Sequence, residues 1–243
     1  MDRVAVAFSG GTDSAFLLKA LRDALGPGNV LAVTVRSEFS TMAEMRDAAR
    51  LAKSLGVKHI VLTAKLLPDP KIRANTPLRC YYCKKKIFSL IKKEALERGY
   101  RIVVDASNID DRKDYRPGRL ALKQLGILSP LEDAGMTKAR IRALSKMAGL
   151  PTWDKPANAC LATRIPYGEK ITRRNLKMAE RAEDIVRRDI GEGRLRVRVH
   201  GDLARIEVPK ERIGKVLALG SITIKGLHAL GFRHITVDME GYR

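Results

Sequence analysis

Glutamine is nearly absent from this chain of 243 residues, since Gln124 is its only occurrence, and asparagine is scarce. The chain has 47 Lys and Arg residues but only 27 Asp and Glu residues, which gives a net charge of +20. A strongly cationic surface attracts polyanions such as nucleic acids, nucleotides or acidic small molecules. Few amides and many charges are also typical of thermophilic proteins, so the charge alone does not identify a nucleic-acid partner.

Long hydrophobic runs are missing as well. No stretch is long and apolar enough to span a bilayer, and the chain enters a strand at Val4, which leaves no room for a signal peptide. We therefore expect a cytoplasmic protein with no membrane partner. The hydrophobic share of 45% supports a substantial core, and the length allows one large domain or a large and a small one.

Aromatic residues make up only 5% of the chain, and cysteine occurs three times. Few aromatics mean few platforms for stacking bases, which disfavours an RNA-binding protein. The only tryptophan, Trp153, is interpreted as a packing residue. An odd number of cysteines in a reducing compartment argues against structural disulfides, so Cys80, Cys83 and Cys160 need another explanation.

Apolar runs and helical patterns alternate through the first part of the chain. Strands are predicted over 4–8, 30–35, 59–63 and 100–105, and helices over 14–25, 42–55, 84–98 and 137–148. This alternation predicts an α/β fold with a doubly wound, Rossmann-like parallel sheet. In such sheets the ligand lies at the carboxyl ends of the strands.

A small α+β domain is predicted after an irregular loop at 151–170 that is punctuated by proline and glycine. Its expected elements are helices over 171–188 and 211–219, strands over 194–200, 203–208 and 234–239, and a hairpin turn at 201–202. We therefore divide the chain into a doubly wound domain, residues 1–168, and a small domain, residues 169–243.

The most informative motif is the string SGGTDS, residues 9–14, between the first strand and the first helix. Gly10 and Gly11 let the backbone approach a ligand closely, and the unpaired N–H groups at the start of the helix favour an anion. Further donors are the hydroxyls of the loop, on Ser9, Thr12 and Ser14. The turn therefore predicts a phosphate or pyrophosphate site, and it is not a Walker A loop because no Gly-Lys-Ser/Thr follows.

Cys80 and Cys83 form a CxxC pair, while Cys160 lies alone in the later loop. The pair suits half of a zinc site, a redox dithiol or an iron–sulfur ligand pair. A zinc site would need a fourth ligand, and the candidates His59 and His200 lack motif spacing. A redox dithiol is disfavoured because the pair does not open the chain at a strand-to-helix turn.

The three thiols could also be unpaired and partly buried. Basic neighbours of the CxxC pair, Arg79, Lys84 and Lys85, instead favour the thiolate form that binds metal. Three thiolates can hold three corners of a [4Fe–4S] cluster. One iron then stays open for an exogenous ligand such as hydrosulfide.

Six strings, in this order, resemble the LarE family of ATP-dependent sulfur transferases, within the PP-loop ATP pyrophosphatase superfamily. They are SGGTDS (9–14), NTPLRCYYCKK (75–85), DASNIDDRKDYRPG (105–118), LGILSPL (125–131), GLPTWDKPANACLATRIPYG (149–168) and RLRVRVHGDLARIEVP (194–209). The resemblance covers nearly the whole chain, and the loop around Cys160 is its most specific part.

The resemblance implies that a carboxylate of pyridinium-3,5-biscarboxylate mononucleotide is adenylated by ATP and that pyrophosphate leaves. Sulfur then displaces AMP and gives a thiocarboxylate, in the biosynthesis of the nickel-pincer cofactor of lactate racemase. One branch of the family gives up the sulfur of the cysteine that matches Cys160. Because this chain has all three cysteines, it resembles the branch that holds a [4Fe–4S] cluster through Cys80, Cys83 and Cys160 and carries sulfide on the open iron.

The same resemblance assigns roles to residues of this chain. Loop residues 9–14 would bind the ATP phosphates, with Asp13 near Mg²⁺, which offsets charge on the departing pyrophosphate. The remaining candidates are Asp110, Asp111 and Asp114 for metal or nucleotide, Arg116 and Arg164 for phosphate or carboxylate, and Arg196, Arg198 and Glu207 for the substrate phosphate. The alternatives are a solvated acidic loop for the aspartates and an ordinary solvent face of a strand pair for the last three.

Two other functions stay open at this point. PP-loop proteins with three-cysteine clusters also thiolate tRNA, which the net charge favours but the few aromatics and the absence of an appended RNA-binding module do not. A non-catalytic iron–sulfur or nucleotide carrier would have no need of an adenylating site. Family members assemble as hexamers, so we expect a homo-oligomer, while the physiological substrate and the sulfur donor are not given by the sequence.

Overall fold

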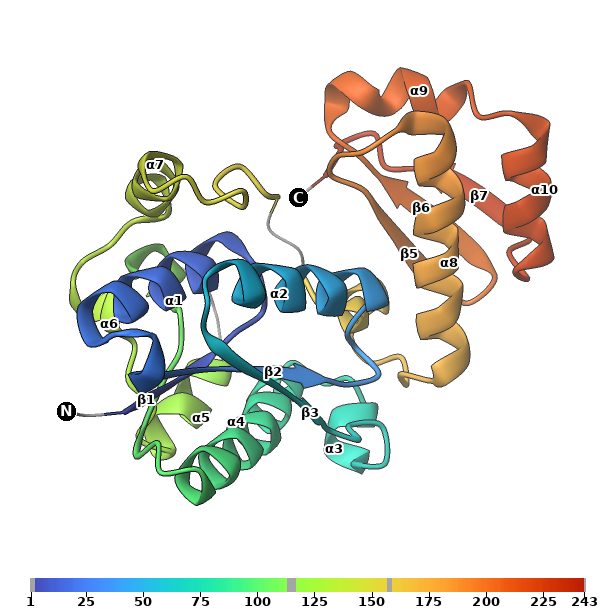
Figure 1. The fold of residues 1–243 in the computed structure, drawn as a ribbon. Helices are drawn as coiled ribbons and strands as arrows, with labels where there is room; N and C mark the ends of the chain where they lie inside the picture. The colour runs from blue at the N-terminus through green and yellow to red at the C-terminus, as the bar shows by residue number, and fades with distance from the viewer. Residues whose placement is uncertain (1–2, 113–116, 157–158, 243) are drawn as a thin grey trace. The chain divides into compact units, whose positions relative to one another are not determined.

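The computed structural model describes residues 3–112, 117–156 and 159–242 and divides into two compact units (Figure 1). The first unit comprises residues 1–66 and 77–158, and the second comprises residues 67–76 and 159–243. Two of the predicted site residues, Asp114 and Arg116, lie outside the described residues.

The first unit is built on a parallel sheet with the strand order β3-β2-β1-β4. Its strands are β1 (Val4–Ala7), β2 (Val30–Arg36), β3 (Lys58–Thr63) and β4 (Ile102–Val104). Because β2 and β3 lie on one side of β1 and β4 lies on the other, the winding reverses between β1 and β4. Ligands of doubly wound sheets bind at this reversal, outside the carboxyl ends of the strands.

Helices cover both faces of this sheet, with α1 and α2 on one side and α4 and α5 on the other (Figure 1). The helices of this unit are α1 (Thr12–Leu25), α2 (Met42–Ser54), α4 (Arg79–Glu97), α5 (Gly118–Gln124), α6 (Pro130–Asp133) and α7 (Lys138–Met147). Strand β1 serves both cores, since Val4 and Val6 pack toward α1 while Ala5 packs toward Phe88 and Ile91 of α4. This two-sided burial explains the uninterrupted apolar strand sequences.

The second unit has a three-stranded sheet in which β6 is central, antiparallel to β5 and parallel to β7. Its strands are β5 (Arg196–His200), β6 (Leu203–Glu207) and β7 (His234–Val237). Its helices are α3 (Pro70–Arg73), α8 (Arg173–Ile190), α9 (Ile213–Leu217) and α10 (Ser221–Ala229). A capping box of Thr172 and Asn175 starts α8, whose buried face includes Leu176, Ala182 and Val186.

Four short 3₁₀ helices complete the secondary structure of the described ranges. They are η1 (Pro27–Asn29), η2 (Ile109–Arg112), η3 (Leu161–Arg164) and η4 (Lys210–Arg212). None of the helices that the structure describes is long and apolar enough to cross a membrane.

The α/β class, the parallel sheet and the small second sheet confirm the fold expected from the sequence, and several boundaries differ. Helix α4 begins at Arg79 rather than near residue 84, and the helix expected over 211–219 is the 3₁₀ turn η4 followed by α9. Helix α10 was not predicted, because Ile222, Thr223, Ile224 and Gly226 give it weak helical propensity. Tertiary burial stabilises it, since Leu227 is fully buried.

The compact units divide at residue 158 rather than after residue 168, and the second unit also includes 67–76. Residues 159–168 join the second unit because Arg164 pairs with Glu183 of α8 and Thr163 accepts a hydrogen bond from Arg198 of β5. Sequence patterning does not reveal such contacts, which join residues far apart in the chain.

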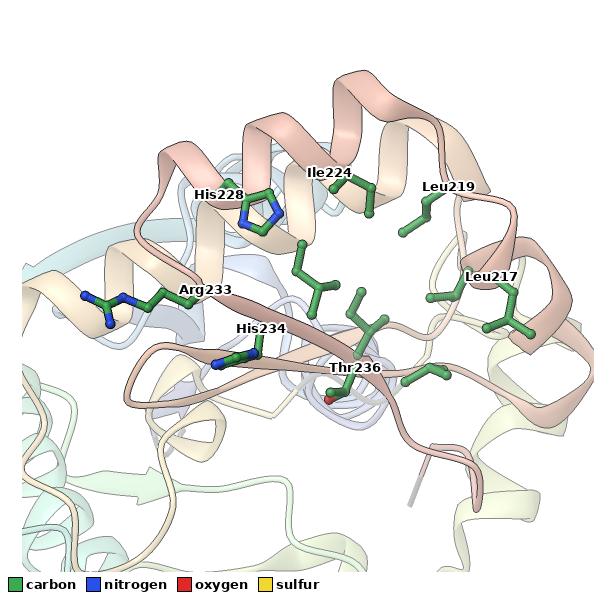
Figure 2. Close-up of a pocket in the computed structure, with 11 residues that line it drawn as sticks. Leu217, Leu219, Ile224, His228, Arg233, His234 and Thr236 are labelled. Carbon is green, nitrogen blue, oxygen red and sulfur yellow. The ribbon is translucent and has the colours of Figure 1, made fainter.

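A groove of ≈ 540 Å³ lies in the second unit between α9, α10 and the edge strand β7. Figure 2 shows Ile224 and His228 on α10 on one side of this groove, with His234 and Thr236 of β7 on the other. Its walls are mostly apolar, and His228 is held by a 2.8 Å hydrogen bond between its Nδ1 and the carbonyl of Phe232. The lining includes none of the residues that the sequence assigns to ATP, metal or substrate.

Asn75 anchors the segment 67–76 within the second unit. It is fully buried and has a positive φ of 55°, a conformation that asparagine tolerates better than most residues. Its Nδ2 donates to the carbonyls of Ile165 at 3.3 Å and Pro166 at 2.7 Å, and its own carbonyl accepts from the amide of Gly168 at 3.1 Å.

We expect Asn75→Ala to destabilise the protein by about 1–3 kcal/mol, because two buried carbonyls lose their donor. Asn75→Gly loses the same bonds but relieves the positive φ, so it separates the side-chain contribution from that of the backbone. The measurement is the free energy of unfolding of the full chain in urea. An Asn75→Ala protein as stable as wild type would show that this anchor is dispensable.

Candidate active site

The SGGTDS loop joins the end of β1 to the start of α1, at the point where the winding of the sheet reverses. Its hydroxyls hold the turn together. Ser14 Oγ lies 3.1 Å from Ser9 Oγ and also donates to the carbonyl of Gly11 at 3.1 Å. Gly10 has a φ of 71°, and a Cβ there would lie 3.0 Å from the backbone of Ala48. Only glycine therefore lets the loop approach α2 this closely.

The strand end before the loop is fixed by a short hydrogen-bond chain. The hydroxyl of Thr34 donates to the carbonyl of Phe8 at 2.7 Å and lies 2.8 Å from His59 Nε2. Since the only proton of that hydroxyl goes to Phe8, His59 must be the donor to Thr34. Burial lowers the pKa of His59, which fits a neutral imidazole in a structural role rather than the zinc ligand considered above.

Asp13, in the first turn of α1, connects the two segments that meet at the reversal of the sheet. Its Oδ2 accepts from Asn108 Nδ2 at 3.1 Å, and Asn108 is fully buried in the segment after β4. Its Oδ1 is buried and has no hydrogen-bond partner among the described residues. Burial raises the pKa of Asp13, nearby Asp111 raises it further, and the charge of Lys138 opposes both.

The other predicted acidic residues of this region are bound into the loop that follows Asn108. Asp111 Oδ2 accepts from the amide of Asn108 at 3.2 Å, and Asp110 Oδ2 accepts from the amide of Lys138 at 2.8 Å. These bonds fix the carboxylates of Asp110 and Asp111 within the loop, and the charge of Asp111 also acts on Asp13.

Asp105 belongs to this edge of the sheet too, although the sequence did not single it out. It is 5% exposed, and its two oxygens accept from Ser107 Oγ and Ser129 Oγ, each at 2.6 Å. Lys84 Nζ of α4 lies 3.8 Å from Asp105 Oδ2. Its place directly after a strand of a parallel sheet was the signal that could have identified it.

Residues 152–155, which we call the strap, lie against the SGGTDS loop. The hydroxyl of Thr12 donates to the carbonyl of Thr152 at 2.6 Å, so it holds the strap rather than standing open to a phosphate. Lys155 Nζ lies 2.9 Å from Asp47 Oδ2 and 3.5 Å from the carbonyl of Gly10. Burial raises the pKa of Asp47, but its bonds to Lys155 and Arg50 outweigh this and hold the pKa below its usual value.

Trp153 in the strap is less buried than a packing residue would be. It is 36% exposed, Lys146 Nζ lies 4.7 Å above its ring, and its carbonyl accepts from Arg142 at 3.4 Å. The ring thus lies on the surface of the first unit, under a lysine from α7.

Cys80 and Cys83 lie within the first five residues of α4, which begins before residue 84, where the sequence predicted its start. Both side chains are half-buried and reduced, and Arg79 Nη2 lies 3.8 Å from Cys80 Sγ. Cysteine sulfurs are the ligands that hold iron–sulfur clusters, so the donor set fits such a group.

Cys160 is exposed in the second unit, at the start of η3. Arg164 holds the segment around it. Its Nε and Nη2 bond both oxygens of Glu183, at 2.7 and 3.1 Å, and its Nη1 donates to the carbonyl of Ala159 at 2.7 Å. Burial lowers the pKa of Arg164, but the bonds to Glu183 outweigh this and raise it. With its side chain 2% exposed, Arg164 positions the Cys160 segment, which differs from the anion-binding role expected of it.

The predicted substrate-binding residues of β5 and β6 share one face of their sheet. Glu207 is 2% exposed and accepts hydrogen bonds from both Arg198 and Arg205, while its other oxygen, Oε2, is buried with no hydrogen-bond partner in the described part of the chain. Arg198 also donates to the carbonyl of Thr163 at 2.9 Å, and Arg196 stacks 4.4 Å from the ring centre of Tyr242. Arg205 was missed by the sequence reasoning, although it lies two residues before Glu207 on the same strand.

Within the described ranges, no group of three or more His, Cys, Asp or Glu side chains is placed to hold a metal ion. Cys80 and Cys83 belong to the first unit and Cys160 to the second.

Asp13→Asn tests the cost of the buried carboxylate. Because the folded-state pKa of Asp13 is raised, the stability that it contributes is present below about pH 4 and is lost as the pH rises through the folded pKa. An asparagine stays neutral, so the variant without ligand should melt at a higher temperature than wild type at pH 7, with the gap closing toward pH 4. It should also lose most of the stabilisation that Mg²⁺ and ATP give wild type. A lower melting temperature at pH 7 would contradict this account.

Comparison with known proteins agrees with this geometry. A family model described as NAD synthase matches residues 1–70, which contain β1 to β3 and the SGGTDS loop. An uncharacterized protein of Synechocystis is 39% identical over 100% of this chain and 91% of its own length. A tRNA-specific 2-thiouridylase of Caldanaerobacter subterraneus is 28% identical over 72% of this chain and 59% of its own.

The pyridinium-3,5-bisthiocarboxylic acid mononucleotide synthase of Lactiplantibacillus plantarum is 40% identical over 100% of this chain and 88% of its own length. The match therefore spans both units of the chain. The chain belongs to the LarE family of ATP-dependent sulfur transferases.

Proposed function

We propose that this protein adenylates a carboxylate of pyridinium-3,5-biscarboxylate mononucleotide with ATP and then replaces AMP by sulfur, as a step of nickel-pincer cofactor biosynthesis. The observation that carries this proposal is the SGGTDS loop at the reversal of the sheet, joined through Asp13 to Asn108. Full-length similarity to a synthase named for the bisthiocarboxylic product supports the choice of substrate.

The first step forms a bond between a carboxylate oxygen of the substrate and the α-phosphorus of ATP. The bond from that phosphorus to the bridging oxygen breaks, and pyrophosphate leaves with the electron pair. In the second step a hydrosulfide attacks the acyl carbon, AMP leaves, and a proton is released from sulfur. The backbone N–H groups of the loop and the start of α1 would hold the phosphates during the first step.

Magnesium fits the site of the adenylation step because its preferred ligands are oxygens. Asp13 offers there a buried carboxylate oxygen without a partner among the described residues. When bound there, the ion would offset charge on the departing pyrophosphate. A cation beside Asp13 would also offset the effect of burial, which raises the pKa of Asp13. Asp111 is the next acidic side chain that acts on Asp13.

Cys80, Cys83 and Cys160 would hold a [4Fe–4S] cluster, whose open iron would supply the sulfide for the second step. The support is the chemistry of the donors, which are three cysteine sulfurs, two of them within the first five residues of α4. The polar network around Arg164 keeps the backbone on both sides of Cys160 in place. The alternative is that Cys160 alone gives up its sulfur.

Further parts of the proposal follow the family resemblance. We propose that the protein is a cytoplasmic homo-oligomer, with a hexamer as its assembly, and that it takes its sulfide from a separate donor. Arg196, Arg198 and Glu207 are proposed to bind the substrate phosphate, and the support is that all three lie on one face of the sheet formed by β5 and β6.

The activity itself is tested with purified protein, the pyridinium biscarboxylate mononucleotide, Mg²⁺, ATP and sulfide, all without oxygen. We expect pyrophosphate and AMP in equal amounts, together with a thiocarboxylate product seen by mass spectrometry. Asp13→Asn should lower the rate of pyrophosphate release by about 10- to 100-fold through weaker metal binding.

Transfer RNA in place of the pyridinium nucleotide is the matched control for the second candidate function, which the thiouridylase relative and the charge of +20 favour. Binding to tRNA that weakens steeply with salt, together with thiolated tRNA as product, would overturn the proposed substrate.

The cluster is tested by iron, acid-labile sulfide and visible absorption of protein purified without oxygen. We expect about four irons and four sulfides per chain, and loss of the cluster in Cys80→Ala, Cys83→Ala and Cys160→Ala. Ser54→Ala, a substitution outside the three cysteines, serves as the control. Zinc or no metal, with loss of one H₂S from Cys160 after reaction, would instead establish the sacrificial mechanism.

A further inference from the structure

The SGGTDS loop carries no positively charged side chain. Residues 9–14 contain one carboxylate, Asp13, and no basic side chain. A triphosphate carries several negative charges, and the pyrophosphate gains another as the bond to the α-phosphorus breaks. Anion sites of this kind usually combine backbone N–H groups with a lysine or arginine. Any basic side chain that joins Mg²⁺ in offsetting this charge must therefore come from a segment outside residues 9–14.

Lys155 of the strap supplies that charge at the loop itself. Its Nζ lies 3.5 Å from the carbonyl of Gly10, the first of the two glycines of the loop, and 2.9 Å from Asp47 Oδ2 of α2. An ammonium group has three N–H donors, so two contacts leave one for a ligand. About 30% of the side chain is exposed, which leaves it open to a nucleotide that enters from solvent.

The place of Lys155 is fixed by its backbone as well as by its ammonium group. Arg142 Nη2 donates to the carbonyl of Lys155 at 2.9 Å, and Thr12 of the loop donates to the carbonyl of Thr152 at 2.6 Å. The strap is thus bound to α7 on one side and to the start of α1 on the other. Such anchoring brings the lysine to the loop with little loss of conformational freedom when a ligand binds.

Three other basic side chains of the first unit already interact with carboxylates. Lys84 pairs with Asp105, and the charges of Lys138 and Arg142 act on Asp13. The partner of Lys155, Asp47, is about 40% exposed, so this ion pair is partly in solvent and contributes little stability. An incoming phosphate can therefore compete with Asp47 for the ammonium at small cost.

We propose that Lys155 is a phosphate-binding residue of the nucleotide site, and that it pairs with the pyrophosphate part of ATP while Asp47 holds it in place before ATP binds. This inference rests on the proposed function for the identity of the nucleotide. The ammonium makes and breaks no covalent bond. It stabilises the negative charge that develops on the leaving pyrophosphate, which is an electrostatic role.

The test compares the binding of ATP, pyrophosphate and AMP, each with Mg²⁺, to the full-length protein by calorimetry. Lys155→Ala should weaken ATP and pyrophosphate by about 10- to 100-fold, the value expected for a lost charge-assisted hydrogen bond, and AMP by less than about 3-fold. Lys155→Arg should recover part of the loss because it keeps the charge.

Arg142→Gln is the matched control, because it releases the backbone of the strap and keeps the ammonium of Lys155. If Lys155 only pins the strap, then Lys155→Ala and Arg142→Gln will weaken ATP and AMP alike, and the proposal is overturned. It is also overturned if Lys155→Ala binds ATP and pyrophosphate as wild type does. Asp47→Asn should bind ATP at least as tightly as wild type, since it removes the competitor.

These measurements need neither the pyridinium substrate nor a cluster, so they separate the two proposals. A wild-type protein that binds ATP but transfers no sulfur would contradict the proposed function and leave the role of Lys155 measurable. A wild-type protein that does not bind ATP would contradict both.

Discussion

The hydrogen bond from Asn108 to Asp13 is the contact on which the organisation of the first unit depends. Asn108 follows β4 and Asp13 follows β1, and these two strands lie on either side of the reversal in the sheet. The bond therefore joins the two loops that a doubly wound fold brings together at its ligand-binding edge. Asn108 also accepts from the amide of Asp110, so the same amide group shapes the acidic loop beside it.

The sequence was sufficient to predict what depends on neighbours along the chain. The SGGTDS string, the alternation of strands and helices and the CxxC pair are local patterns, and the fold that they imply is the one observed. What it did not reveal depends on contacts between distant segments. Thr12 reads as a phosphate donor until its partner, the carbonyl of Thr152, is known, and Arg164 reads as an anion site until Glu183 is known.

The start of α4 illustrates the same limit on a smaller scale. Helical periodicity is clear only in the basic run after Cys83, so the helix was predicted to begin at residue 84. No side chain caps this helix, and its N-cap is Leu78, a residue that gives no start signal. The observed start places both cysteines on α4, three residues apart, which puts them on one face of the helix.

Several arginines pair with buried glutamates, so these side chains are not part of the cationic surface that is available to a partner. Glu183 takes both donors of Arg164, Glu207 is shared by Arg198 and Arg205, and Glu132 is shared by Arg112 and Arg119. Each of these carboxylates is less than 9% exposed, and a charge buried this deeply requires such partners. These five arginines are thus a requirement of folding.

Buried carboxylate oxygens without a partner point to the same two places as the family resemblance. Three such oxygens occur among the described residues, on Asp13, Glu38 and Glu207, and two of these residues were assigned to sites from the sequence alone. An unsatisfied buried oxygen costs folding free energy, so it persists where binding of a ligand compensates for it. Asp13 lies in the first unit and Glu207 in the second. Each unit therefore carries its own unsatisfied acceptor, as expected if one binds the metal with ATP and the other takes part in binding the acceptor of sulfur.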